Sequence, residues 1–277
     1  MPGPERVVII TGASRGIGLA AARWLAGSQA SVVLVSRSAE GLRRATGEVE
    51  AGGGRALAVA EDLADPAAAR RIVEAALDRF GAVHAVVNNA ATIEPVSTVA
   101  EVDLGAWLDL VRLNLLGPLA MCQAALPSLR ASAGRIVNVV TIVATMPVPA
   151  LSGYASSKAA LVQMTRVLAL EEPSVTALAL DPGPTDSDMM VTLRQGAQAA
   201  MPQQWAERYE GMQRDSLLNP PELPARSIAW LALHAPPTMS GELVTFDRPD
   251  VAGPALESFG SFGGEPLRVA TPPPPPT

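Results

Sequence analysis

Tyr154 and Lys158 stand four residues apart, in the stretch Tyr-Ala-Ser-Ser-Lys. Residues at this spacing share one face of a helix, so the lysine ammonium is expected beside the tyrosine hydroxyl. An adjacent positive charge stabilises the phenolate and lowers the tyrosine pKa, which is otherwise about 10. The pair is therefore a candidate proton donor near neutral pH. Taken alone, Tyr-x-x-x-Lys could also be a chance pair on a helix surface.

Lys158 is the only lysine in the chain, and apart from two histidines every other basic side chain is an arginine. A sequence that otherwise uses arginine keeps a lysine at this position. This suggests that the site requires a compact ammonium and not a planar guanidinium. The same ammonium could also reach the ribose of a cofactor.

A second motif is the glycine-rich stretch 11–18, which reads Thr-Gly-Ala-Ser-Arg-Gly-Ile-Gly. The apolar run 7–10 before it predicts a buried strand, and the run 19–26 after it is rich in helix-forming residues. Glycines let a pyrophosphate approach the backbone, and the helix N-terminus favours its negative charge. An ordinary glycine turn is the alternative. The motif predicts a dinucleotide site formed by Gly12, Ser14, Arg15, Gly16, Ile17 and Gly18.

The end of the second strand-like run indicates which dinucleotide is bound. An acidic residue there would bind the ribose hydroxyls of NAD, but the chain has Ser36 and Arg37 instead. Together with Arg15, Arg37 offers two guanidinium groups that suit a 2′-phosphate. We therefore expect NADP(H), with two solvated turn arginines as the alternative.

These motifs are followed by others in an order that resembles the short-chain dehydrogenase/reductase family, over about residues 5–247. The further matches are Asp62, the Asn-Asn-Ala-Ala run 88–91, Asn114, Thr141 and Pro182-Gly183, and the intervals from Asn114 to Thr141 and to Tyr154 agree with the family pattern. The resemblance implies a catalytic set of Asn114, Thr141, Tyr154 and Lys158. It implies no metal. Beyond the glycine turn and Arg37, it implies cofactor contacts from Asp62, Leu63, Asn89, Ala90, Tyr154, Lys158, Pro182, Gly183 and Thr185.

Within the family, the stretches 181–189, 216–220 and 240–247 resemble the sepiapterin-reductase and benzil-reductase type. This implies NADPH-dependent reduction of a ketone or dicarbonyl. Thr141 and Tyr154 would hydrogen-bond the carbonyl oxygen, and Tyr154 would give the proton. Lys158 would tune Tyr154, and Asn114 would hold a water that links Lys158 to solvent.

The same residues would equally support alcohol oxidation or imine reduction. A cofactor-binding regulatory protein whose activity has lapsed is a third possibility, and only Thr141 favours it. Thr141 replaces the serine of the family, which keeps the hydroxyl but adds a methyl group. Ala91 replaces the glycine of the usual Asn-Asn-Ala-Gly. His84 stands where many members carry aspartate, and we expect it to be structural.

Strand-like runs alternate with helical ones at 7–11, 31–36, 55–60, 83–88, 134–141, 174–180 and 242–246. This alternation predicts an α/β fold with a doubly wound, mainly parallel sheet of Rossmann type and helices on both faces. Ligands of such sheets bind beyond the carboxyl ends of the strands, where Gly12, Asn88, Thr141 and Pro182 all fall.

We expect one reductase domain over residues 1–252, in which residues 184–220 form a substrate lid rich in methionine and aromatics. Simple helix packing would use the same residues. Residues 253–277 are rich in Pro and Gly and are expected to be a disordered tail that can be removed without loss of folding. By the resemblance, the helices near 103–130 and 154–171 form the interface of a homodimer or homotetramer, with an ordinary core-facing surface as the alternative.

The composition, with 48% hydrophobic and 17% charged residues, fits a soluble globular enzyme. The net charge of -6 gives no basic footprint for nucleic acid. The single cysteine, Cys122, is compatible with a reducing compartment and is expected to be an inert core thiol. No apolar run is expected to span a membrane, and the short lead into the first strand argues against a signal peptide. We therefore expect a cytoplasmic enzyme with a small-molecule carbonyl substrate.

Overall fold

The computed structural model describes residues 6–265, and a seven-stranded sheet forms its centre. The strand order is β3-β2-β1-β4-β5-β6-β7, and every neighbouring pair is parallel. The strands are β1 (Val7–Thr11), β2 (Ser31–Ser36), β3 (Arg55–Ala60), β4 (Ala85–Asn88), β5 (Arg135–Val139), β6 (Thr176–Asp181) and β7 (Leu243–Thr245). The predicted doubly wound parallel sheet is confirmed.

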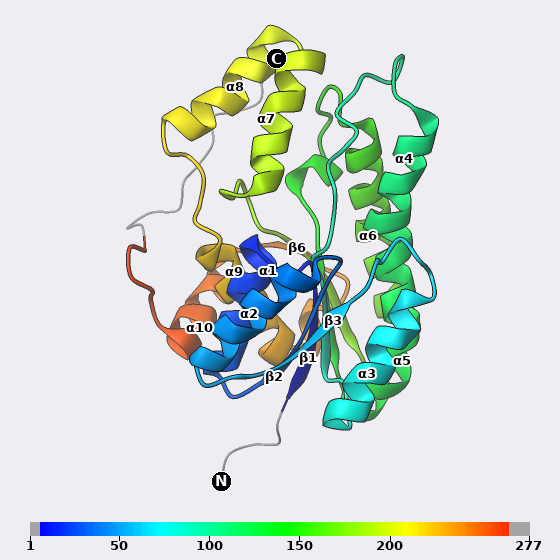
Figure 1. The fold of residues 1–277 in the computed structure, drawn as a ribbon, viewed down its shortest axis with the longest axis vertical. Helices are drawn as coiled ribbons and strands as arrows, with labels where there is room; N and C mark the ends of the chain where they lie inside the picture. The colour runs from blue at the N-terminus through cyan, green and yellow to red at the C-terminus, as the bar shows by residue number, and fades with distance from the viewer. Residues whose placement is uncertain (1–5, 266–277) are drawn as a thin grey trace.

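Two layers of helices cover the two faces of the sheet (Figure 1). One layer holds α1 (Gly16–Gly27), α2 (Ala39–Ala51), α9 (Glu222–His234) and α10 (Pro249–Phe259); the other holds α3 (Ala68–Phe80), α5 (Gly117–Ser132) and α6 (Ser152–Glu171). Successive strand residues point to opposite faces. Thus Val8 and Ile10 of β1 pack in the first layer, whereas Val7 and Ile9 pack in the second. The inner strands β1, β2, β4, β5 and β6 are buried on both sides, which explains their nearly continuous apolar runs, whereas the edge strand β3 is partly exposed.

A long helical segment, residues 104–132, consists of α4 (Leu104–Val111), a π-helical turn (Arg112–Leu116) and α5. By length and composition it could cross a bilayer, which the sequence analysis did not anticipate. The same properties are common in core helices of soluble proteins. Here α5 packs against α3 and β4. The core between the sheet and the second helical layer includes Met121, Cys122, Ala125 and Leu129.

Residues between β6 and α9 form an excursion that lies beyond the carboxyl ends of the strands (Figure 1). It contains α7 (Asp188–Ala200) and α8 (Gln203–Arg214). A parallel bridge between Thr185 and Asn219 joins its two ends, and the Asn219 N–H donates to the Pro184 carbonyl at 2.8 Å. The two ends of the excursion are thus held together where they join the rest of the domain.

The C-terminal region departs from the sequence-based expectation. Residues 253–259 were expected in a disordered tail but belong to α10, which buries Val251 and Ala255 against the core. The ring centroids of Phe259 and Phe262 lie 5.7 and 6.4 Å, respectively, from that of Trp24. The helix starts with Pro249 at a position that favours proline, whereas Pro254 lies inside the helix and removes one backbone hydrogen bond. The remaining part of the expected tail, 266–277, lies outside the described residues.

Candidate active site

The glycine turn between β1 and α1 is packed tightly against the segment that follows β4. Gly12 has a φ of +68°, and a Cβ there would lie 2.9 Å from Ala90 Cα and from Asn89 Nδ2. The Asn89 and Ala90 N–H groups each donate to the Thr11 hydroxyl at 3.0 Å, and Asn89 Nδ2 donates to the Thr11 carbonyl at 2.9 Å. Asn89 therefore supports the turn, and its contact with the cofactor stays a prediction.

The outer side of the same turn is open and fits the phosphates of a dinucleotide. Gly16 has a φ of +55°, and a Cβ there would have no atom within 4 Å. Helix α1 starts at Gly16, and no side chain caps its first N–H groups. The positive end of the helix dipole therefore stays available at this open side. A phosphate is the natural partner of such a helix end.

The residues expected at the adenosine end lie after the carboxyl ends of β1 and β2. Ser14 is close to the start of α2, because a Cβ on Gly41 would lie 3.0 Å from Ser14 Cβ. Arg37 is exposed just after β2. Arg15 forms an ion pair with Asp188 at 2.6 Å, which links the glycine turn to the first residue of α7. Both partners are largely exposed, so this pair contributes little to stability.

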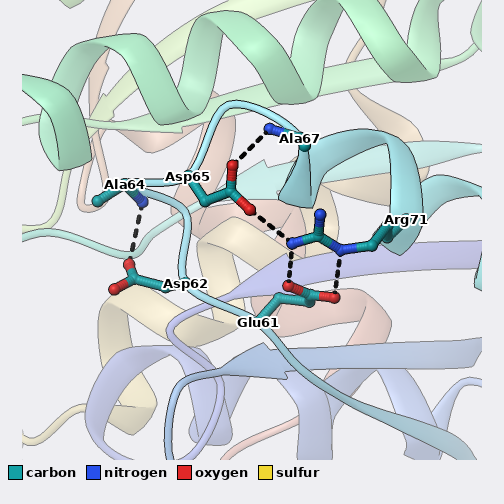
Figure 2. A network of polar contacts seen from close by, with 6 residues as sticks. All are labelled: Glu61, Asp62, Ala64, Asp65, Ala67 and Arg71. Carbon is teal, nitrogen blue, oxygen red and sulfur yellow. Dashed lines mark hydrogen bonds and ion pairs between the residues drawn. The ribbon is translucent and has the colours of Figure 1, made fainter.

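The loop after β3, with Asp62 and Leu63, is held in place by its own polar contacts (Figure 2). The Asp62 carboxylate accepts from the Ala64 N–H at 3.0 Å, and Leu63 is buried. Arg71 of α3 donates to Glu61 and to Asp65, with distances of 2.6–2.7 Å. The Arg71 hydrogen bonds lower the pKa of both carboxyls. Asp62 is thus presented at the sheet edge by a fixed loop.

Tyr154 and Lys158 lie one turn apart on α6, as predicted from their spacing. The Lys158 ammonium is buried and donates to the Val139 carbonyl at 2.8 Å, and it lies 6.0 Å from the centre of the Tyr154 ring. The Tyr154 hydroxyl donates to the sulfur of Met189 at 3.7 Å. The tyrosine therefore faces α7, while the lysine is anchored to the end of β5.

The predicted direction of the tyrosine pKa is wrong for this structure. Burial raises the pKa of Tyr154, and the charges of Asp181 and Tyr209 add to the effect. Burial also lowers the pKa of Lys158 to about 8. Desolvation outweighs the attraction of the lysine, because the ammonium is held by a backbone carbonyl and not by the phenol oxygen.

Thr141 follows β5 in extended backbone and caps a short 3-10 turn (Ile142–Ala144). Its hydroxyl oxygen accepts from the Val143 N–H at 3.3 Å. An accepting hydroxyl still has its own hydrogen to donate. Thr141 and Tyr154 both line the same pocket.

Asn114 lies in the π-helical turn and is completely buried. Its side chain accepts from the Thr92 N–H at 2.9 Å and donates to the Thr92 carbonyl at 2.8 Å. It also donates to the Ser157 hydroxyl at 3.3 Å, and Ser157 precedes Lys158. Asn114 therefore connects the loop after β4 to the catalytic face of α6. Turns of π-helix of this kind often occur at functional sites.

The pocket beside Tyr154 has a volume of about 180 Å³ and is mainly apolar. It brings together six residues expected from the sequence: Ile17, Thr141, Tyr154, Pro182, Gly183 and Thr185. Of the methionine and aromatic residues in the predicted lid, residues 184–220, the pocket is lined by Met189, Met190, Trp205, Tyr209 and Met212. Met201 and Leu217 pack in the cluster behind it, so lid lining and helix packing are both present.

Two charged residues of the pocket, Asp181 and Arg208, were missed by the sequence analysis. Asp181 is the last residue of β6, and its carboxylate accepts from the Gly183 N–H at 3.0 Å. Burial raises its pKa. The position of Asp181 at the carboxyl end of a strand could have identified it as a pocket residue from the sequence. Arg208 shares a helical face with Trp205 and Tyr209, and that spacing was a usable signal as well.

Two expectations outside the site are confirmed. His84 Nδ1 accepts from the Val7 N–H at 3.0 Å, so the ring joins β1 to the start of β4 and is structural. Cys122 is a buried free cysteine, and burial raises its pKa to about 12. A thiol in this state is unreactive.

A parallel sheet of this order, a glycine turn after its first strand and a Tyr/Lys pair beside an apolar pocket define a nicotinamide-dependent oxidoreductase. The chain matches the family model "short chain dehydrogenase" over residues 6–198 and belongs to the short-chain dehydrogenase/reductase family. It is accordingly an oxidoreductase that acts on carbonyl or alcohol substrates with a nicotinamide cofactor.

Three relatives illustrate the range of the similarity. The crystal structure of YIR035C from Saccharomyces cerevisiae has a TM-score of 0.85 and 31% identity, covering 90% of this chain and 98% of that one. Benzil reductase ((S)-benzoin forming) IRC24 of the same yeast is 30% identical over 255 residues, 87% of this chain and 96% of the relative. Cis-4-hydroxycyclohexanecarboxylate dehydrogenase of Sinomonas cyclohexanicum is 32% identical over 249 residues, 88% of this chain and 95% of the relative.

Proposed function

We propose that this protein reduces a ketone or dicarbonyl to an alcohol with NADPH, and that Tyr154 gives the proton. The observation that carries the proposal is the pair of hydroxyls, Thr141 and Tyr154, on one apolar pocket next to a buried Lys158. Similarity to a benzil reductase over nearly the whole chain supports carbonyl reduction.

When bound, the reduced nicotinamide supplies a hydride. Tyr154 holds the proton destined for the substrate oxygen, because a phenol is protonated at neutral pH. Thr141 donates a second hydrogen bond to the same oxygen. Lys158 stabilises the tyrosinate that remains after proton transfer. The apolar lining excludes water, so these interactions act at low dielectric on the developing alkoxide.

The preference for NADPH is supported by the end of β2, where exposed Arg37 follows Ser36 and no acidic residue is present to bind a free ribose. Of the two guanidinium groups expected to bind the 2′-phosphate, that of Arg15 forms an ion pair with Asp188. An exposed ion pair of this kind is worth about 0–1 kcal/mol. A phosphate that makes charge-assisted hydrogen bonds can therefore displace it.

Oxidation of a secondary alcohol is the second candidate, since one relative is named as the dehydrogenase of a hydroxycyclohexane carboxylate. The same residues serve this reaction in reverse, with Tyr154 taking the proton. We place reduction first because a benzil reductase and a levodione reductase are among the similar proteins.

The test is a panel of vicinal diketones, simple ketones and imines with NADPH or NADH, together with secondary alcohols and the oxidised cofactors. We expect NADPH to be consumed with a ketone or diketone, and Arg37→Ala to raise the NADPH Kd by about 10- to 100-fold. NADH binding should stay unchanged, and Arg70→Ala on α3 is the matched control. Equal or better use of NADH would refute the cofactor assignment. NADPH binding without turnover of any substrate would indicate a regulatory protein.

A further inference from the structure

The hydroxyl of Tyr154 is engaged by a methionine of helix α7. It donates to the Met189 sulfur at 3.7 Å, and among the described residues this sulfur is its one hydrogen-bond partner. Both residues line the pocket in which the substrate carbonyl is expected. A thioether sulfur is a weak acceptor, so a carbonyl oxygen can displace it. The sulfur therefore accepts the same hydrogen bond that the substrate oxygen has to accept.

The backbone around Met189 is held by contacts at the start of α7. The preceding residue, Asp188, pairs with Arg15 of the glycine turn at 2.6 Å. The Ser187 hydroxyl caps the helix by accepting from the Met190 N–H at 3.4 Å. The methionine side chain itself is flexible and adaptable. A chemical change at its sulfur can therefore act on the tyrosine without a large movement of the helix.

The Met189 sulfur belongs to a residue that a small oxidant can reach. Met189 is half-buried, whereas Met121, Met212 and Met239 are buried. The pocket beside it has a volume of about 180 Å³, so one added oxygen atom can be accommodated. Oxidation of methionine gives a sulfoxide, which turns an apolar side chain into a polar one. The sulfoxide oxygen is a much stronger hydrogen-bond acceptor than the thioether sulfur.

We propose that Met189 is an oxidation site at which a peroxide inhibits the enzyme, because the sulfoxide oxygen retains the hydrogen bond of the Tyr154 hydroxyl against the substrate. The inhibition rests on the proposed function, whereas the oxidation and the new hydrogen bond do not. The sulfur forms a bond to one peroxide oxygen as the O–O bond breaks. The sulfur loses two electrons, and hydrogen peroxide is reduced to one water molecule that keeps both hydrogens.

The test treats the complete enzyme with hydrogen peroxide, removes the excess and measures reduction of the best carbonyl substrate with NADPH. Peptide mass spectrometry gives the fraction of Met189 that has gained one oxygen. In proportion to this fraction we expect KM for the carbonyl to rise about 3- to 10-fold with kcat nearly unchanged, because the substrate has to displace a neutral hydrogen bond. Dithiothreitol should not reverse the effect, since it reduces oxidised thiols and not sulfoxides.

Three variants locate the effect. Met189→Leu should keep its own KM after peroxide treatment, because it has no sulfur to oxidise. Met189→Gln carries an amide oxygen in place of the sulfur and should show the raised KM without any peroxide. The control is Met190→Leu at the neighbouring residue, which also lines the pocket and should stay as sensitive to peroxide as the wild type.

Several results would overturn the proposal while leaving carbonyl reduction intact. They are an unchanged KM in wild type that is oxidised at Met189, an equal loss in Met189→Leu, and a KM in Met189→Gln equal to that of Met189→Leu. Recovery with dithiothreitol would assign the effect to Cys122, the only thiol of the chain. No oxidation of Met189 at a dose that oxidises the half-buried Met164 and Met201 would also refute it.

If no carbonyl is reduced even before treatment, the proposed function fails, and the site is tested by its hydrogen bond alone. The chain has two tyrosines, Tyr154 and Tyr209, so NMR of protein with ¹³C-labelled tyrosine gives two ring signals, which Tyr209→Phe assigns. Peroxide should shift the Tyr154 signal in the wild type and not in Met189→Leu. An unshifted signal in protein oxidised at Met189, or an equal shift in Met189→Leu, refutes the proposal.

Discussion

Thr141 is the residue at which this chain departs from its family within the catalytic set, and its position beside Tyr154 gives it a testable role. Thr141→Val keeps the shape and removes the hydroxyl, so the developing alkoxide loses one donor. The loss of a comparable donor lowers kcat about 10²- to 10³-fold. Thr141→Ser should keep or raise activity, because only a methyl group is removed. Steady-state kinetics with all three proteins measure this.

The control for Thr141 is the NADPH Kd together with the melting temperature, since the hydroxyl also accepts the Val143 N–H at 3.3 Å. Neither should change greatly in the valine variant. A Thr141→Val enzyme as active as the wild type would show that the threonine is structural.

We expect Lys158 to make the activity dependent on pH. Its pKa is lowered to about 8 by burial, so the ammonium is present below pH 8 and is lost as the pH rises through that value. Tyr154 stays protonated over this range, because its own pKa is raised. We therefore expect kcat/KM for reduction, which reports the free enzyme, to fall above about pH 8.

The pH profile of Lys158→Arg provides the comparison. A guanidinium does not titrate in this range, so whatever activity remains should show no fall near pH 8. A wild-type profile that stays level up to pH 10 would exclude Lys158 as the titrating group.

The types and spacing of the catalytic residues could be read from the sequence, whereas their electrostatics could not. Tyr154 and Lys158 share a face of α6 as their interval predicts. The pKa of Tyr154 is raised first by burial and then by the charges of Asp181 of β6 and Tyr209 of α8, which are distant in sequence. Local spacing contains no information on such neighbours.

At the scale of the elements, the π-helical turn at Asn114 is a further case. A continuous helix was expected near 103–130, and the sequence does not indicate the extra residue in this turn. Its partners, Thr92 and Ser157, come from separate elements. The turn is therefore a tertiary feature, which propensity alone does not predict.

Helix α10 and the residues after it hold a buried ion pair that should matter for stability. Arg226 of α9 is 6% exposed, donates to both Glu265 carboxylate oxygens at 2.8 Å and to the Gly260 carbonyl at 3.0 Å. Deleting residues 253–277 leaves this charge without its partners, at a cost of about 3–5 kcal/mol. The melting temperature should fall by on the order of 10 °C or more.

Smaller changes sharpen this test. Deletion of 266–277 alone keeps Glu265 and the aromatic contacts of Trp24, so it should have a much smaller effect. Glu265→Gln should destabilise the protein more than Glu257→Gln, since Glu257 is exposed on α10. A protein that melts unchanged without residues 253–277 would show that α10 is dispensable, as the composition of this segment first suggested.

At the scale of the whole molecule, exposed apolar side chains gather on the long helical segment and on α6. They are Leu104, Leu108, Leu116, Leu119, Val167 and Leu170. We propose that they form the interface of a homodimer or homotetramer, because burying such a group removes a large apolar surface from water. Light scattering after size exclusion should show an oligomer. Leu104→Glu with Leu108→Glu should give monomers.

The control is Leu256→Glu on α10, which covers the other face of the sheet. Because Leu256 lies outside the proposed interface, this variant should still form a dimer or a larger oligomer. A wild-type protein that is monomeric at micromolar concentration would contradict the proposed interface.

The order of the sheet and its two helical layers follow from the alternation of apolar and helical runs, because parallel strands with right-handed crossovers allow few arrangements. The C-terminal region was misjudged on its composition. Its Pro and Gly content suggested disorder, but the burial of Val251 and Ala255 and the contacts of Phe259 with Trp24 are decided by the tertiary fold.

The central claim is that Tyr154 gives the proton in carbonyl reduction. Its most direct test is the turnover of the best carbonyl substrate by wild type and Tyr154→Phe, with NADPH binding measured in parallel. We predict a fall in kcat of about 10²- to 10⁴-fold, as expected for loss of a general acid, with NADPH still bound within a few-fold of the wild-type Kd. A Tyr154→Phe enzyme that reduces the substrate at nearly the wild-type rate would contradict the claim.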